Sequence, residues 1–199
     1  MKKFKWLALC LVFVLTVSAL AGCGNNNGNV NDNNNEDNND NSAATTGTLT
    51  MGTNAEFAPF EFVNEDNEYD GFDIDLAKEI AAVLGMELEI ENMDFNSLIP
   101  ALESERIDMV VAAVTIREDR VERVNFTEPY YNAGQAIIVQ ESNTDIEGID
   151  DLADKVIGVQ LGTTGDFEAQ EIAPDENIIR FQQIGLVFEE LATGRIDAI

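Results

Sequence analysis

The sequence contains no histidine and only two cysteines, and its 11 basic residues are far outnumbered by 38 acidic ones. Without histidine, a histidine-based catalytic triad, a histidine-containing zinc site and the usual proton shuttle near neutral pH are excluded. The net charge of −27 argues against nucleic acid and anionic lipid surfaces as partners. One cysteine, Cys10, lies in an apolar N-terminal run, so a chain cleaved after that run has no internal disulfide.

The N-terminus has the organisation of an export signal. A lysine-rich start precedes an apolar run over residues 6–20, which is shorter than the about 20 residues that a membrane-spanning helix needs. The run ends in Leu20-Ala21-Gly22-Cys23, which resembles the lipobox of bacterial lipoproteins, where the cysteine is acylated and becomes the new N-terminus. We therefore expect residues 1–23 to be a lipoprotein signal peptide and Cys23 to carry lipid, including palmitate. A plain secretory peptide with an incidental cysteine is the alternative.

Residues 24–46 are rich in asparagine and poor in large apolar side chains. Such a segment cannot bury enough apolar surface to offset its chain entropy. We therefore expect a disordered tether that holds a soluble domain away from the membrane. The remaining residues, 47–199, suffice for a packed core.

From residue 47 onward, predicted strands and helices alternate. The predicted strands cover residues 48–52, 86–90, 109–114, 136–139, 156–159 and 178–180, and residues 60–63 and 68–71 form a hairpin. The predicted helices cover residues 73–84, 97–104, 115–124, 166–172 and 184–192. This alternation predicts an α/β fold in which mostly parallel sheets have helices on both faces.

Two short motifs that occur twice in the sequence indicate two lobes of similar topology. Residues 102–108 and 191–197 share the pattern L-x3-R-I-D, and each segment follows a predicted helix and leads into an apolar strand. Upstream, the Gly-Thr pairs at residues 52–53 and 162–163 each end a predicted strand. We interpret the two pairs of matches, which occur in the same order, as a repeated lobe.

The repeated motifs also indicate the domain boundaries. We place the first lobe at residues 47–131 and the second at residues 132–199. Only Ala198 and Ile199 follow the second R-I-D, whereas a complete apolar strand follows the first. We therefore expect the second lobe to be incomplete and the chain to be truncated at its C-terminus.

Candidate binding residues lie where strands end, because open α/β sheets bind ligands beyond the carboxyl ends of their strands. Three loops there offer hydroxyls, amides, aromatic faces and one guanidinium, but no nucleophile paired with a base. The candidates are Asn54, Glu56 and Phe57 in the first loop, Ala113, Val114, Thr115 and Arg120 in the second, and Gln160, Thr163 and Thr164 in the third.

The second loop carries the strongest electrostatic features. Thr115 and Glu118 have the spacing of a capping box, and the N-terminus of the helix they would open suits a carboxylate. Arg120 lies in that predicted helix, and its guanidinium is suited to bind the same carboxylate bidentately. A surface arginine paired with Glu118 or Glu122 is the alternative.

Five sequence blocks, taken in order, resemble one known family. They are residues 53–61 (TNAEFAPFE), 71–81 (GFDIDLAKEIA), 93–102 (MDFNSLIPAL), 115–120 (TIREDR) and 129–131 (PYY). These blocks resemble family 3 of the bacterial extracellular solute-binding proteins, the polar amino acid binders of ABC transporters, over residues 49–199. The resemblance implies a two-lobed, periplasmic-binding-protein-like fold of type II, with the ligand between the lobes.

The resemblance also implies roles for the candidate residues. Arg120 and Thr115 would hold the α-carboxylate of the ligand, and the assisting groups would be the backbone near Ala113 and Val114 and either Thr163 or Thr164.

The predicted side-chain pocket is less specific. Phe57 and Phe95, which periodicity alone favours as core residues, would lie on the two sides of the ligand's side chain, an arrangement that favours flat or cationic groups. Asn54 and Gln160 are departures, because many relatives have an acid at the first position and some have a base at the second. The sequence therefore leaves the bound amino acid open.

The predicted function is that of the lipid-anchored substrate-binding component of an ABC importer, on the extracytoplasmic side of the cell membrane. Its partners would be a polar amino acid, a permease and the membrane through the lipid anchor, but not nucleic acid. We expect a monomer without enzymatic activity, cofactor or metal.

Two alternatives stay open. One is a dehydratase of the same fold that acts on prephenate-like acids, with Glu56 as the only candidate catalytic carboxylate in the three loops. The other is the sensor part of a receptor, which would require a membrane-spanning segment beyond Ile199.

Overall fold

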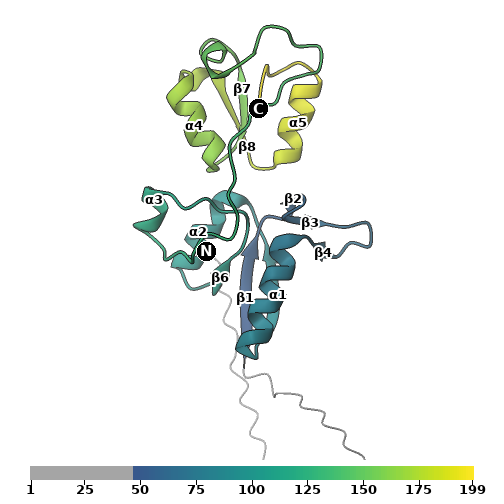
Figure 1. Cartoon of the computed structure of the whole chain (residues 1–199), viewed down its shortest axis with the longest axis vertical. Coiled ribbons are helices and arrows are strands. Elements are labelled where there is room, and N and C mark those ends of the chain that lie inside the picture. Colours follow the sequence, from purple (N-terminus) through teal and green to yellow (C-terminus); the bar gives the residue numbers. More distant parts are fainter. Residues whose placement is uncertain (1–46) are drawn as a thin grey trace, which may run out of the picture. The chain divides into compact units, whose positions relative to one another are not determined.

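The computed structural model describes residues 47–199 (Figure 1). The predicted signal peptide at residues 1–23, the lipidation site Cys23 and the predicted tether at residues 24–46 lie outside the described residues. Within the described part, every helix is too short or too polar to cross a bilayer.

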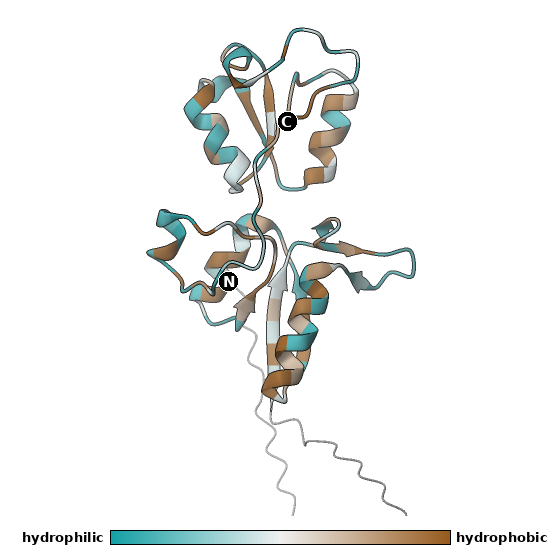
Figure 2. Cartoon of the chain, in the orientation of Figure 1, coloured by the Kyte–Doolittle hydropathy of each residue, from teal (hydrophilic) through white to brown (hydrophobic). Residues whose placement is uncertain are grey.

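The first lobe is built on a parallel sheet of three strands in the order β5-β1-β6. Its strands are β1 (Thr48–Thr53), β5 (Glu87–Asn92) and β6 (Met109–Val110). Helix α1 (Phe72–Leu84) packs on the sheet, and a core of Met51, Ile74, Ala77 and Val111 lies between them. The apolar residues of α1 recur at helical spacing, so that hydrophobic and hydrophilic residues interleave along it (Figure 2). Gly85 ends the helix in a left-handed conformation, as its sequence position predicted.

A second, antiparallel sheet joins the carboxyl end of β1 to α1. It consists of β2 (Glu56–Phe57), β3 (Glu61–Val63) and β4 (Tyr69–Asp70). The predicted hairpin is confirmed as β3 and β4, and β2 is an addition that the sequence did not indicate. Gly71 connects β4 to α1 with a φ of 120°, and a Cβ there would lie 2.3 Å from the carbonyl oxygen of Phe60. Only glycine therefore allows the close turn that places the start of α1 beside β3.

The segment after β6 differs from its prediction. β6 ends at Val110, four residues before the predicted strand end, and helix α3 covers only Glu118–Val121. The predicted capping box at Thr115 is wrong, because Arg117 is the N-cap and the amides of Arg120 and Val121 both donate to its carbonyl. The residues between β6 and α3 instead form an irregular loop, in which Ala113 has a φ of 47°.

A short 3-10 turn, η1 (Phe95–Ser97), leads into α2 (Leu98–Glu103), as the predicted helix at residues 97–104 indicated. Leu98 and Ala101 are the buried residues of α2. This turn and helix carry Phe95 and Asn96 to the carboxyl end of the first sheet, where the site forms.

The second lobe contains the parallel pair β7 (Ile157–Gln160) and β8 (Ile178–Phe181). Helices α4 (Thr164–Ile172) and α5 (Ile184–Ala192) flank this pair (Figure 1), and the 3-10 turns η2 (Ile149–Asp151) and η3 (Asp175–Asn177) lie in its connections. β7 is buried at every position because both of its faces are covered. The predicted strands and helices of this region are therefore confirmed, within about two residues at their ends.

The strand predicted at residues 136–139 is not formed. Ile138 instead exchanges two backbone hydrogen bonds with Ile199, of 2.9 and 2.8 Å, and Ala198 forms an isolated parallel bridge with Ile157. Each pairing is a single step long, which is too short for a strand. Ile137 and Ile138 are each 40% exposed, whereas Val139 packs against the core of the second lobe.

The repeated R-I-D segments have the same structure in both lobes. Asp108 accepts a hydrogen bond from the Thr50 amide at 2.8 Å, and Asp197 accepts one from the Val156 amide at 2.8 Å. Each aspartate therefore fastens the end of its segment to the neighbouring strand, β1 in the first lobe and the start of β7 in the second.

The isoleucine of each segment covers a strand glycine. An added Cβ would meet Ile107 at 2.4 Å if built on Gly52, and Ile196 at 2.3 Å if built on Gly158. The structural counterpart of Gly52 is thus Gly158. The predicted match between the Gly-Thr pairs at residues 52–53 and 162–163 is wrong by four residues, because Gly162 lies in the turn after β7.

Candidate functional site

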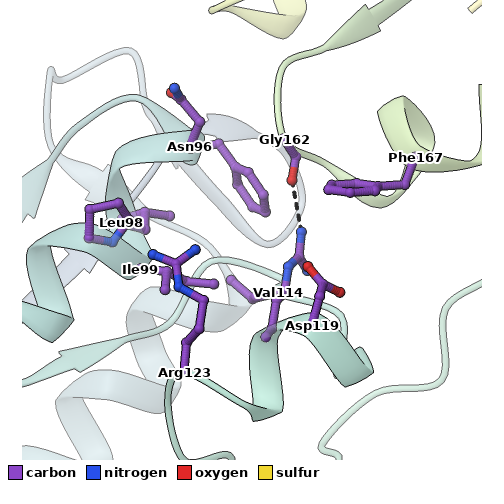
Figure 3. Close-up of a pocket in the computed structure, with 11 residues that line it drawn as sticks. Asn96, Leu98, Ile99, Val114, Asp119, Arg123, Gly162 and Phe167 are labelled. Atoms are coloured by element: carbon purple, nitrogen blue, oxygen red, sulfur yellow. Dashed lines mark hydrogen bonds between the residues drawn. The ribbon is translucent and has the colours of Figure 1, made fainter. Parts of the chain in front are cut away.

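Residues from both lobes line one cavity of about 140 Å³ (Figure 3). It is smaller than the pockets of about 300–1,000 Å³ that hold drug-sized ligands. The first lobe supplies most of its wall, and Gly162 and Phe167 of the second lobe complete it. Three of the ten predicted binding residues line this cavity, namely Phe95, Val114 and Arg120.

Arg120 is the central charged group of the cavity. Its residue surface is only 4% exposed, and its guanidinium donates to the carbonyl oxygens of Thr115 and Gly162, each at 2.9 Å. The bond that ends on Gly162 is the dashed line in Figure 3. Burial, followed by the nearby positive charge of Arg117, lowers the pKa of the Arg120 guanidinium.

No carboxylate among residues 47–199 forms an ion pair with Arg120. The alternative of a surface arginine paired with Glu118 or Glu122 is therefore wrong. A buried cation whose partners are neutral carbonyls is costly, and an anion placed beside it would compensate its charge.

The loop before Arg120 offers fewer free donors than a helix N-terminus would. The Ala113 amide donates to Asp73 at 2.7 Å, and the carbonyl of Thr115 accepts from Arg120. The side chain of Thr115 is exposed and does not cap a helix. Only Val114 of these three predicted residues contributes to the cavity wall.

The third loop is held in place by α4. Thr163 is the N-cap of that helix; its hydroxyl donates to the Gln160 carbonyl at 2.8 Å and accepts from the Asp166 amide at 3.3 Å. Thr164 is the first residue of α4. The buried Asp166 carboxylate accepts from the Gly162 amide at 2.9 Å and pairs with Arg180 at 2.7 Å. This loop therefore presents the Gly162 carbonyl to Arg120 in a fixed position.

Asn54 and Gln160 lie against each other outside the cavity. The Gln160 side-chain amide donates to the Asn54 side-chain oxygen at 2.8 Å and to the Gln182 carbonyl at 3.1 Å, and both side chains are buried. Asn54 in turn donates to the Met93 carbonyl at 3.0 Å. The side chains of Asn54 and Gln160 therefore satisfy each other's hydrogen bonding and link the two lobes.

The two predicted stacking rings are placed differently. Phe95 lines the cavity, and the Arg120 guanidinium lies 5.5 Å from its ring centre. Phe57 is 46% exposed and stacks on Phe60 with ring centres 5.8 Å apart, and it does not line the cavity.

Eight of the eleven residues that line the cavity were not among the predicted binding residues, namely Asn96, Leu98, Ile99, Pro100, Asp119, Arg123, Gly162 and Phe167. Arg117 stacks over the Phe167 ring at 3.4 Å and pairs with Asp119 at 2.9 Å, and both partners line the cavity. Arg117 could have been noticed, because it lies in the same sequence block as Arg120. Phe167 gave no such sign, since its place in α4 suits a core residue equally well.

Two α/β lobes that together line one cavity, with a buried cation in its wall, define the class of two-lobed ligand-binding proteins. The family described as "Bacterial extracellular solute-binding proteins, family 3" matches residues 49–199, and the chain belongs to this family. Its fold is accordingly the type II periplasmic-binding-protein fold that the sequence blocks predicted.

Three relatives illustrate the similarity. The chain is 38% identical over 152 residues to the "Arginine-binding extracellular protein ArtP" of Bacillus subtilis, which covers 75% of this chain and 59% of that protein. Its structure resembles "An ancestral arginine-binding protein bound to arginine", with 46% identity, a TM-score of 0.73 and coverage of 76% and 68% of the two chains. It also resembles the ancestral amino acid-binding protein AncCDT-1, "a precursor of cyclohexadienyl dehydratase", with 39% identity, a TM-score of 0.71 and coverage of 76% and 68%. The chain thus spans about 59% of the length of its curated relative from Bacillus subtilis.

Proposed function

We propose that this protein captures a polar amino acid outside the cytoplasm and that Arg120 binds the α-carboxylate of the ligand. The observation that carries the proposal is the burial of the Arg120 guanidinium without a carboxylate partner among residues 47–199. Charge-assisted hydrogen bonds to an anion contribute about 1.5–3 kcal/mol each, which is more than neutral carbonyls provide. An α-carboxylate of suitable size would therefore displace one or both carbonyl contacts.

We propose arginine as the first ligand to test. Two of the similar proteins are named for arginine binding. The cavity has the aromatic rings of Phe95 and Phe167 and the carboxylate of Asp119 in its wall, and these groups suit a flat, cationic side chain. The net charge of −27 would also concentrate a cationic ligand near the protein.

The remaining parts of the proposal rest on the sequence and on the family. Acylation of Cys23 would anchor the protein to the membrane, and residues 24–46 would act as the tether. Ligand binding between lobes 47–131 and 132–199 would stabilise the closed form, which the permease of an ABC importer would recognise. In this scheme the binding protein is a monomer and performs no chemical step.

A thermal-shift panel of the twenty amino acids on the chain from Gly47 tests the proposal. A ligand that binds only the folded state adds about 2.7 kcal/mol of stability at a hundredfold excess over its dissociation constant. We expect a clear rise of the melting temperature with arginine. The matched control is Arg120→Met, which keeps the volume but removes the charge, and whose melting temperature arginine should not raise. A cooperative melt that no amino acid shifts would refute the proposal.

The same preparation tests the dehydratase alternative. Glu56, its candidate catalytic carboxylate, accepts a hydrogen bond from Gln183 at 2.9 Å, so one of its oxygens is already engaged. Consumption of prephenate by the wild-type chain, lost in Glu56→Gln, would establish an enzyme in place of a binding protein.

A further inference from the structure

Two carboxyl groups, those of Glu61 and Asp73, are buried together outside the set of residues that line the cavity. Glu61 of β3 is 1% exposed and Asp73 of α1 is fully buried. Residues 47–199 provide no basic side chain that pairs with either group. Two buried carboxylates cannot both remain ionised at close range, because each charge is desolvated and repels the other.

One proton explains the hydrogen bonding of the pair. Oε2 of Glu61 and Oδ1 of Asp73 are both buried and lack any other hydrogen-bond partner. A proton on Glu61, donated to Asp73, gives a partner to both oxygens at once. In agreement, burial and then the charge of Asp73 raise the pKa of Glu61 to about 9. One proton shared by the two carboxyls leaves the pair with a single negative charge.

The other oxygen of Asp73 binds two separate parts of the molecule. Its Oδ2 accepts from the Ala113 amide at 2.7 Å and from the Tyr130 hydroxyl at 3.0 Å. Burial and the charge of Asp73 raise the pKa of Tyr130, so this hydroxyl keeps its proton and donates it. Ala113 lies two residues before Thr115, whose carbonyl oxygen accepts a hydrogen bond from Arg120. Tyr130 lies in the segment that leaves the first lobe.

The position of the pair is itself fixed by β3 and α1. Glu61 pairs in register with Phe57 of β2, and the Gly71 turn places the first turn of α1 against Phe60. Ala113 takes a positive φ of 47°, which a non-glycine residue adopts at a cost unless other contacts hold it. The hydrogen bond to Asp73 supplies such a contact.

We propose that Glu61 and Asp73 form a singly protonated pair of positioning residues, which sets the loop that presents Arg120 and ties it to the outgoing segment at Tyr130. Neither residue lines the cavity. The proposal rests on Arg120 as the ligand-binding residue. Ionisation of Glu61 would place a second negative charge beside Asp73 and weaken its hold on the loop between β6 and α3. Ligand affinity should therefore fall when Glu61 loses its proton. The groups that face the pair from neighbouring elements are the Tyr130 hydroxyl and the Ala113 amide.

The experiment compares affinity for L-arginine by calorimetry between pH 6 and pH 9.5 in the wild-type chain and in Glu61→Gln. Glutamine keeps a donor toward Asp73 but does not titrate. We expect the two proteins to agree near pH 6 and the wild type to bind at least fivefold more weakly than Glu61→Gln at pH 9.5. The amino group of the ligand also titrates in alkali, but its effect cancels in this ratio. A ratio that is constant over the whole range overturns the proposal.

A second set of variants tests the positioning role directly. Asp73→Ala should lower arginine affinity at least tenfold, Asp73→Asn should recover most of it because an acceptor for Ala113 remains, and the exposed neighbour Asp75→Ala should bind like the wild type. Wild-type affinity in Asp73→Ala would contradict the proposal, and if that variant fails to fold, the pH comparison decides.

Hydrogen exchange separates this proposal from the proposed function. If no amino acid binds the wild type, the proposed function fails, but the exchange of the Ala113 amide still tests the pair. Its protection should fall faster with rising pH in the wild type than in Glu61→Gln, after correction for intrinsic exchange. Equal protection in the two proteins would refute the pair independently of any ligand.

Discussion

At the scale of single residues, burial of the Arg120 guanidinium carries a desolvation cost that a bound anion would offset. The guanidinium is buried with two neutral carbonyl partners, 5.5 Å from the centre of the Phe95 ring, so the cavity wall holds a charge that water no longer solvates fully. The TIREDR block identified this residue from sequence, but the sequence did not reveal its contacts. Those depend on Gly162, 42 residues further along the chain, which no local pattern can indicate.

Arg120→Lys should keep the charge and yet lose most of the binding. A lysine has no planar pair of donors for a carboxylate and cannot reach the carbonyls of Thr115 and Gly162 together. We expect arginine affinity to fall at least tenfold in a calorimetric titration, while the melting temperature without ligand changes little. Affinity within twofold of the wild type would mean that another group binds the α-carboxylate.

The free energy of unfolding should depend on the proton of Glu61. The folded protein keeps this proton up to a pKa of about 9, whereas the unfolded chain releases it near 4.5. The folded state therefore binds more protons between these values, and its stability falls as the pH rises from about 4.5 to about 9, by up to about 1.4 kcal/mol per pH unit for one proton.

Urea unfolding at pH 5, 7 and 9 measures this dependence. Glu61→Gln should lack the decline and be more stable than the wild type at pH 7 to 9, whereas the exposed Glu65→Gln should follow the wild type. Parallel pH profiles for Glu61→Gln and the wild type would show that Glu61 does not hold a proton in the folded state.

At the scale of elements, the predictions succeeded where local chemistry is decisive. α1 has a regular apolar spacing and a terminating Gly85, and β7 is buried at every position. They failed at residues 111–117, where a sequence suited to a strand and a capped helix forms a loop instead. There the contacts of Asp73 with Ala113 and of Arg120 with Thr115 outweigh local preference, and both come from tertiary structure.

Gly158→Ala should destabilise the second lobe by about 1–3 kcal/mol, because the added methyl group would lie 2.3 Å from Cδ1 of Ile196 and 2.8 Å from Cγ1 of the buried Val187. Adding Ile196→Val removes the nearer atom and should restore part of the loss. Gly185→Ala in α5 is the matched control: it has open space, and it should be neutral or stabilise the helix by up to about 1 kcal/mol. Chemical unfolding of the wild type, the two single glycine variants and the double variant measures these differences. Wild-type stability in Gly158→Ala would show that the Ile196 side chain moves aside without cost.

At the scale of the whole molecule, the fold was predictable from the sequence, whereas the contacts between the lobes were not. Alternating strands and helices predicted the α/β fold, the repeated motifs predicted two lobes, and family membership confirmed the two-lobed fold. The hydrogen bonds between the lobes, such as Gln160 with Asn54 and Gln183 with Glu56, were not predictable, since they join residues more than 100 positions apart.

The net charge of −27 should make the capture of a cation depend on salt. Raising the ionic strength from about 0.01 to 0.15 M shortens the screening length from about 30 to 8 Å. We expect the association rate of arginine, followed by stopped-flow tyrosine fluorescence, to fall severalfold over this range. Glutamine, which is neutral overall, serves as the comparison if it binds, and an equal decline for both would exclude electrostatic steering.

The hydrogen bonds by which Asp108 and Asp197 hold the backbone of β1 and the residue before β7 have a consequence for substitutions at the ends of these strands. Asn54 follows Thr50 by four residues and Gln160 follows Val156 by four, so the two amides stand at equivalent strand ends. Each strand end is fixed within its own lobe, by Asp108 with Ile107 or by Asp197 with Ile196. A substitution at Asn54 or at Gln160 would therefore leave the backbone fastening of both strands unchanged, and would act only through the contacts of the replaced side chain.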